Sequence, residues 1–345
     1  MAPPTSNILA QVRRSCAQLL AHEDAAVRVN DEKIALFLET LDWQKYATLA
    51  EPTRFPLNFR STQEEITFLT LYGLLNFGSG FRKDLHKYCG RGAADTILYG
   101  LLGMYISVPA LSSAYLQNIS LEVVANFFSI PTERDEEIST GIYIAKPGPL
   151  KPLVQMIQQV LNECGQKLVE RGYTDFGAFV IANMRADESK EPSAAYLVEQ
   201  LTSIFPAFDD HREVRGEKCF LLKRAQLVAA EVHRRFKTSN PEYSFSDIDE
   251  LTVMSDNVLP CVLRALGILE YAPELARIID SCEHLPSGDW ECEVRAAAVV
   301  ACEKIAAASN GRVNVVDLDF YLWRLGKDPE YRSLERHATR DTFFY

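Results

Sequence analysis

The stretch that decides the fold is PLKPLVQMIQQVLNECGQKLVER, residues 149–171. Its apolar residues recur at intervals of three and four positions, which places them on one face of an α-helix. These residues are Leu153, Met156, Ile157, Val160, Leu161, Cys164 and Leu168. Gly172 follows, and a glycine at this place commonly ends a helix in a left-handed conformation. The stretch therefore predicts a long amphipathic helix with one buried face.

The same spacing recurs along most of the chain. It predicts helices over residues 8–20, 33–41, 61–76, 193–204, 219–236, 260–269, 293–307 and 315–325. Ser61-Thr62-Gln63-Glu64 forms a capping box, in which the serine and glutamate oxygens accept free amides at a helix start. Strand patterns are scarce, and only residues 214–222, around Arg215-Gly216, predict a β ribbon. We therefore expect a mainly α, multi-helical fold with at most a short β ribbon.

The composition is that of a folded globular protein. The 345 residues are 47% hydrophobic and 24% charged, which excludes disordered, collagen-like and disulfide-scaffold chains. The formal net charge of -11 argues against DNA as a ligand, because binding a phosphate backbone needs a basic face. The sequence has no secretory segment, no run of roughly 18 apolar residues and no C-x-x-C pair among its eight cysteines. We expect a cytoplasmic protein, with the nucleus as a further location, that has reduced thiols and neither structural zinc nor contact with membranes.

The organisation of the chain indicates one domain over residues 1–345. No repeat of 20–50 residues is visible, which argues against a solenoid. The interval from Ile130 to Pro149 carries prolines, a glycine and a charged run, which are typical of a connecting segment. We therefore expect two lobes, at about 1–148 and 149–345. Gly78-Ser79-Gly80 lacks the dinucleotide-binding pattern, and a helix stop is favoured there over a phosphate cradle.

Two charged residues stand at places where chemistry is possible. Asp256 lies four residues before Pro260, where a turn brings its side chain near a helix start. The alternative is an aspartate that only forms a turn or caps the helix. Lys223 lies between Leu222 and Ala225, beside an apolar face, and a cation there needs an anionic partner. That partner is a protein carboxylate or a ligand phosphate, and the internal ion pair is the more common arrangement.

An acidic residue also stands near aromatic side chains toward the end of the chain. Asp319 and Trp323 are four residues apart and share one helical face. An acid beside an aromatic surface suits a flat, polar ligand such as a nucleobase, whereas core packing with a surface acid is the commoner arrangement.

Six motifs occur in order along the second half of the chain. They are Phe205-Pro206-Ala207-Phe208, Lys223-Arg224-Ala225-Gln226, Thr252-Val253-Met254-Ser255-Asp256 with Leu259-Pro260, Glu293-Val294-Arg295, Asp319-Phe320-Tyr321-Leu322-Trp323 and the terminal Tyr345. Together they resemble the queuosine salvage protein family from about Glu199 to Tyr345, with weaker anchors at Leu57-Asn58 and Leu75-Asn76-Phe77. The resemblance implies a helical fold related to DNA glycosylases. It also implies hydrolysis of the N-glycosidic bond of queuosine 5'-phosphate or a related modified nucleotide, which releases queuine without a metal or cofactor.

The resemblance assigns roles to individual residues. The family's catalytic aspartate falls on Asp256, and its base-contacting aspartate falls on Asp319. Glycosidic cleavage builds positive charge on the sugar, which a nearby carboxylate stabilises. A 5'-phosphate needs a cationic anchor. The candidates by charge, for this anchor or for a structural ion pair, are Lys223, Arg224, Arg295, His337 and Arg340.

Four further positions align with contacts to the base. Phe320 is conservatively changed, whereas Phe55 replaces a histidine, Met254 replaces an aromatic residue and Arg324 replaces an aspartate. A guanidinium in place of an acceptor inverts the charge available to a bound base.

These changes leave other functions open. One alternative is a non-catalytic helical binding or scaffold paralogue, and a weaker one is RNA-stem binding through residues 212–223, which the acidic charge disfavours. We favour the enzyme because Asp256 is present, with a small-molecule nucleotide as its partner and no obligate protein partner.

Overall fold

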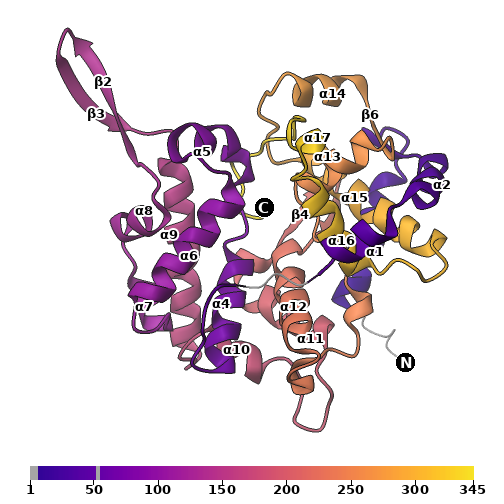
Figure 1. Cartoon of the computed structure of the whole chain (residues 1–345), viewed down its shortest axis with the longest axis horizontal. Helices are drawn as coiled ribbons and strands as arrows, with labels where there is room; N and C mark the ends of the chain where they lie inside the picture. The colour runs from indigo at the N-terminus through magenta and orange to yellow at the C-terminus, as the bar shows by residue number, and fades with distance from the viewer. Residues whose placement is uncertain (1–6, 52–54) are drawn as a thin grey trace. The chain divides into compact units, whose positions relative to one another are not determined.

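The computed structural model describes residues 7–51 and 55–345, which form two compact units (Figure 1). The first unit consists of Met1–Leu57 and Asn183–Thr342, and the second consists of Asn58–Ala182 and Phe343–Tyr345. Residues 148 and 149 both lie in the second unit. One domain with lobes at 1–148 and 149–345 stays a prediction.

The first unit is built mainly from helices around α15. Its α-helices are α1 (Ile8–Leu20), α2 (Asp31–Thr40), α3 (Trp43–Leu49), α11 (Ala194–Ile204), α12 (Lys223–Phe236), α13 (Val258–Ala265), α14 (Pro273–Asp280), α15 (Asp289–Ala308), α16 (Val315–Leu325) and α17 (Pro329–Arg332). Its short 3-10 helices are η2 (Pro206–Phe208), η3 (Pro241–Tyr243) and η4 (Ile248–Glu250). Residues 295–302 of α15 read Arg-Ala-Ala-Ala-Val-Val-Ala-Cys. These mostly small side chains let α1, α2 and α13 approach closely, and the middle of α15 is buried.

Two short antiparallel sheets complete the first unit. β1 (Val27–Val29) pairs with β6 (Leu269–Tyr271), with Val27 opposite Tyr271. β4 (His211–Val214) pairs with β5 (Glu217–Phe220) through a turn in which Arg215 and Gly216 both have positive φ. A two-residue turn of this kind matches the twist of a hairpin. The ribbon predicted around Arg215-Gly216 is therefore confirmed, at 211–220.

The second unit is a helical assembly with one hairpin. Its helices are α4 (Thr62–Leu74), η1 (Ser79–Phe81), α5 (Arg82–Cys89), α6 (Ala93–Ser107), α7 (Ser113–Asn118), α8 (Leu121–Phe128), α9 (Lys151–Glu170) and α10 (Phe176–Ala182). The apolar face of α9 is buried, and Leu153, Ile157 and Leu161 are at most 2% exposed. At Gly165 this helix meets α7 so closely that a Cβ atom would overlap the backbone of Gln117.

The described residues contain three two-stranded sheets, two more than the single short ribbon that the sequence indicated. β2 (Glu133–Ser139) and β3 (Ile142–Pro147) form a hairpin that projects beyond the helices of the second unit (Figure 1). It occupies the interval expected to be a connecting segment. Its strands are largely exposed on both faces, so the sequence lacks the apolar–polar alternation of a half-buried strand. β1 and β6 have three residues each, too few for a pattern to be visible.

The mainly α fold is confirmed, and most predicted helices begin and end within a few residues of the observed ones. Three boundaries differ by four residues, and the first is the start of α15, which was expected at 293 and lies at Asp289. The helix expected over 219–236 begins at Lys223, because Cys219 and Phe220 belong to β5 and Leu222 has a φ of 50°. The helix expected over 260–269 runs instead over Val258–Ala265. Among the described residues, no helix has the length and apolar character needed to cross a membrane.

Candidate active site

A buried segment without regular structure leads into α13 and carries Asp256. This aspartate is 5% exposed, and its Oδ1 accepts hydrogen bonds from the Val258 N–H at 2.6 Å and the Leu259 N–H at 3.2 Å. The first amides of a helix have no partner within the helix, and they favour negative charge. As predicted from the spacing to Pro260, the side chain of Asp256 lies at the helix start.

Asp319 holds the same segment from α16. Its Oδ1 accepts a hydrogen bond from the Met254 N–H at 2.7 Å, and the side chain is 5% exposed. Burial and, after it, the negative charge of Asp256 raise the pKa of Asp319 to about 7, although the Met254 N–H and the Lys223 ammonium act to lower it. Asp319 is therefore divided between its protonated and ionised forms at neutral pH.

Lys223 brings a buried cation to the two carboxylates. It is the first residue of α12 and is buried. Burial lowers the pKa of Lys223 to about 8, while the charges of Asp256 and Asp210 raise it. The structure thus brings Asp256, Asp319 and Lys223 into one electrostatic neighbourhood, as expected if a cation beside this apolar face has an acidic partner.

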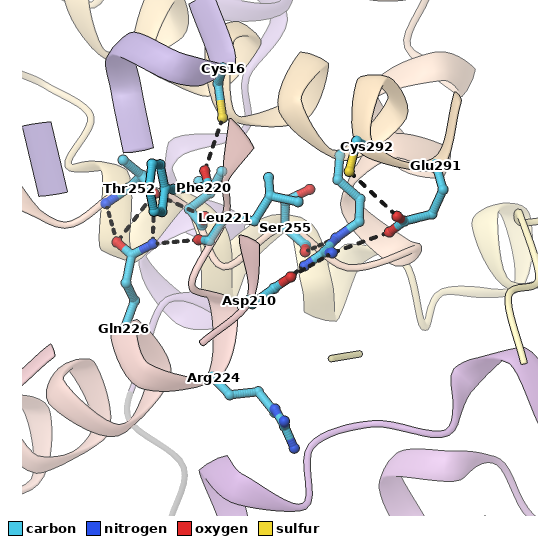
Figure 2. A network of polar contacts seen from close by, with 12 residues as sticks. Cys16, Asp210, Phe220, Leu221, Arg224, Gln226, Thr252, Ser255, Glu291 and Cys292 are labelled. Carbon is cyan, nitrogen blue, oxygen red and sulfur yellow. Dashed lines mark hydrogen bonds and ion pairs between the residues drawn. The ribbon is translucent and has the colours of Figure 1, made fainter. Parts of the chain in front are cut away.

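Gln226 fixes the beginning of the Asp256 segment. Its Oε1 accepts the Thr252 N–H at 2.8 Å, and its Nε2 donates to the Thr252 hydroxyl at 3.0 Å and to the Leu221 carbonyl at 3.0 Å (Figure 2). No role was predicted for Gln226, although it lies in the Lys-Arg-Ala-Gln motif. A glutamine that satisfies a buried backbone amide positions the chain around it.

Arg295 forms the structural ion pair that was one of its two predicted roles. It is buried, and its guanidinium contacts both Asp210 and Glu291, while its Nε donates to the Ser255 carbonyl at 3.0 Å. In Figure 2, the dashed lines from Asp210, Ser255 and Glu291 meet at one guanidinium. Asp210 and Glu291 were not predicted, although the four-residue spacing of Glu291 and Arg295 is that of an intrahelical ion pair.

The other predicted cations differ in their surroundings. Arg224 donates to the Ala207 carbonyl, and its guanidinium lies 6.0 Å from the centre of the Phe208 ring. Burial and the charge of Arg295 lower the pKa of His337 to about 3, so this imidazole is neutral at neutral pH. Its carbonyl accepts a hydrogen bond from Asn257 at 3.1 Å. His337 therefore lacks the positive charge for which it was selected.

The remaining predicted residues also belong to the first unit. Met254 and Phe320 are buried, and the Arg234 guanidinium lies 4.0 Å from the centre of the Phe320 ring. Arg324 donates to the carbonyl of Leu49, the last residue of α3, and to the carbonyl of Glu51, at 2.5 Å each. Phe55 and Arg340 are half-buried, and their roles stay predictions.

Glu231 is a buried acid that the sequence analysis missed. It lies on α12, is 3% exposed, and burial raises its pKa to about 7 against the charges of Arg234 and Arg324. Its only signal in the sequence is an acidic residue within an otherwise apolar and basic helix. Within 7–51 and 55–345, no three histidine, cysteine or acidic residues are grouped so as to hold a metal ion.

Comparisons with known proteins agree with the motifs. The family model described as queuosine salvage protein matches residues 62–345. The queuosine 5'-phosphate N-glycosylase/hydrolase of Sphaerobacter thermophilus is 32% identical over 241 residues, 69% of this chain and 67% of that protein. The protein of the same name from Schizosaccharomyces pombe is 36% identical over 180 residues, 51% of this chain and 49% of its own. The one from Bos taurus is 25% identical over 311 residues, 84% of each chain.

Proposed function

Because this chain belongs to the queuosine salvage protein family, we propose that it hydrolyses the N-glycosidic bond of queuosine 5'-phosphate and releases queuine. The observation that carries the proposal is the buried Asp256, held at the start of α13 with Asp319 and Lys223 in its electrostatic neighbourhood. A pair of carboxylates in different environments is typical of enzymes that cleave glycosidic bonds.

The proposed reaction separates the base from the sugar and adds water. The bond between the anomeric carbon and the base nitrogen breaks, and its electron pair leaves with the base. Positive charge builds on the sugar, and the Asp256 carboxylate stabilises it. The oxygen of a water molecule then bonds to the anomeric carbon. One proton of that water passes to Asp256, which later returns it to the solvent, and the departing base nitrogen takes up one proton from the solvent. Free base and ribose 5-phosphate are then the products, and Asp256 is ionised again.

We assign Asp319 to the departing base. A 7-deazaguanine lacks the N7 that ordinary purines can protonate, so hydrogen bonds to the leaving base matter more. Oδ1 of Asp319 accepts a hydrogen bond from the Met254 N–H, and we propose that Oδ2 forms a hydrogen bond with the base. With a pKa of about 7, Asp319 can donate a hydrogen bond in its protonated form or accept one when ionised. We place Phe55, Met254, Phe320 and Arg324 around the same base.

We propose Lys223 as the cation for the 5'-phosphate, with Arg340 as a second candidate. A pKa of about 8 keeps Lys223 mostly protonated at neutral pH. His337 is neutral there, and the guanidinium of Arg295 is bound to Asp210 and Glu291. An ammonium binds a phosphate as a point charge without the fork geometry of arginine.

The reaction as proposed uses no metal or cofactor, because carboxylates supply both the charge and the proton transfer. Unchanged base release in the presence of a chelator would support this. We also propose that the protein works inside the cell, in salvage of a base used in tRNA modification, without an obligate protein partner. Its eight cysteines are all free, which is typical of a reducing compartment.

The test is chromatographic detection of free base after purified protein is incubated with queuosine 5'-phosphate. The Asp256→Asn variant keeps an oxygen to accept the Val258 and Leu259 amides, so we expect it to fold and to lose at least about 100-fold in rate. Asp280→Asn is the matched control, since Asp280 is 58% exposed and pairs with Arg264.

Each outcome of this test has one meaning. Release by wild type and Asp280→Asn, but not by Asp256→Asn, supports the proposal. Full activity of Asp256→Asn would refute the role of Asp256. Absence of release from the wild type would favour the non-catalytic binding paralogue.

A further inference from the structure

A buried arginine holds the peptide that precedes Asp256. Arg295 is 2% exposed, and its Nε donates to the Ser255 carbonyl at 3.0 Å. This carbonyl belongs to the planar peptide unit that ends at the Asp256 nitrogen and Cα. The hydrogen bond therefore restricts the direction in which the Asp256 side chain leaves the backbone.

Asp210 orients the guanidinium that makes this contact. Nη1 of Arg295 lies 3.2 Å from Oδ1 of Asp210, and Nη2 lies 2.5 Å from Oδ2 (Figure 2). Nη1 also donates to Oε1 of Glu291 at 3.2 Å. A two-pronged pairing fixes the rotation of a planar guanidinium as well as its position, which leaves Nε directed at Ser255.

The same aspartate also braces the start of α12. The backbone oxygen of Asp210 accepts the Leu221 N–H at 3.0 Å and the Leu222 N–H at 3.1 Å, directly before Lys223. Its carboxylate is held by Arg295. One buried residue thus connects the backbone that carries Lys223 with the arginine that holds the Asp256 peptide.

We propose that Arg295 is a positioning residue, which fixes Asp256 through the Ser255 carbonyl and is itself oriented by Asp210. The inference rests on the proposed function, because it assigns a role in that reaction. This positioning role takes the place of phosphate binding as the role that we assign to Arg295. Arg295 acts on the geometry of Asp256 and does not contact the nucleotide.

Arg295→Lys tests the role with the positive charge retained. A single ammonium cannot reproduce the forked pairing with Asp210 and the separate Nε contact with Ser255. We expect kcat for base release from queuosine 5'-phosphate to fall about 10- to 100-fold, because small misplacements of a reacting group have effects of this size. KM should stay within about twofold, since binding contacts remain.

Arg215→Lys is the matched control. Arg215 also pairs with a buried acid of α15, Glu293, at 2.5 Å, but no described contact joins it to residues 252–258. The same substitution there should leave kcat within about twofold of wild type. Near-ultraviolet circular dichroism and thermal unfolding of both variants report whether the fold is retained.

Asp210→Asn is a second variant, which tests the same role if Arg295→Lys does not fold. Asp210→Asn keeps the backbone oxygen bound to Leu221 and Leu222 but removes the charge that orients Arg295. We expect kcat to fall about 3- to 10-fold with KM unchanged.

The outcomes separate the inference from the function on which it rests. Wild-type release with a loss of kcat in Arg295→Lys, but not in Arg215→Lys, supports the inference. Wild-type release with full kcat in a folded Arg295→Lys or Asp210→Asn overturns it alone, as does a loss that lies in KM. Absence of release by the wild type overturns the proposed function and the positioning role together.

Discussion

Asp319→Asn should make the protein more stable at alkaline pH. The wild-type carboxyl is buried, and its pKa rises from an ordinary 3.8 to about 7 through burial and the charge of Asp256. The folded state therefore binds this proton more tightly than the unfolded state. Its contribution to stability is complete below pH 4 and is lost as the pH rises to about 7.

The size of the effect follows from the two pKa values. Each pH unit between them is worth about 1.4 kcal/mol, so an ionised Asp319 costs about 4 kcal/mol at pH 8. About 3 kcal/mol of this cost develops between pH 5 and pH 8. Asparagine has no charge to bury and keeps an oxygen for the Met254 N–H. The free energy of unfolding of the variant, relative to wild type, should therefore rise by about that amount over this range.

Urea unfolding at pH 5, 6, 7 and 8 measures the difference. Asp280→Asn is the control, because Arg264 lowers the pKa of Asp280, and the contribution of that pair is constant over this range. A difference between Asp319→Asn and wild type that does not change from pH 5 to pH 8 would show that Asp319 is not held as a desolvated carboxyl.

Two further predictions concern Glu231 and Gly165. The pKa of Glu231 is raised from 4.5 to about 7, so its contribution to stability is lost as the pH rises through 7, and Glu231→Gln should raise the melting temperature more at pH 8 than at pH 5. An equal shift at both values would contradict this. Gly165→Val should overlap the backbone of Gln117 and destabilise the second unit by about 1–3 kcal/mol, whereas Gln166→Ala on the exposed face of α9 should have little effect in the same urea titration. Unchanged stability of Gly165→Val would refute the close approach of α9 and α7.

The helices could be predicted wherever local signals were complete. α16 was predicted to the residue, because Asn314 caps it and its apolar face repeats every three to four positions. β1 and β6 could not be predicted, because their pairing joins residues 27 and 271, and three residues carry no period of their own. The start of α12 was placed too early because the apolar residues of β5 continue the helical spacing in the sequence. Only the backbone of Leu222 shows the break.

The site could be predicted in part, for a similar reason. Asp256 and Asp319 both stand in motifs. In the structure Asp319 accepts a hydrogen bond from the Met254 N–H, two residues before Asp256. Asp210 lies 85 residues before Arg295, and no local pattern indicates that the two side chains meet. Buried ion pairs of this kind are properties of the folded chain, and a single sequence shows only the charges.

The departures from the family pattern can be weighed against the contacts that remain. Met254 replaces an aromatic residue, but its contact with Asp319 is made by its backbone N–H, which any residue except proline supplies. Arg324 replaces an acid, and one of its terminal nitrogens donates to the carbonyls of Leu49 and Glu51. Neither of these two differences removes one of the described hydrogen bonds that hold the segment carrying Asp256. Because hydrogen bonds from Gln226, Asp319 and Arg295 hold residues 252–255, directly before Asp256, these departures do not argue for a loss of catalysis.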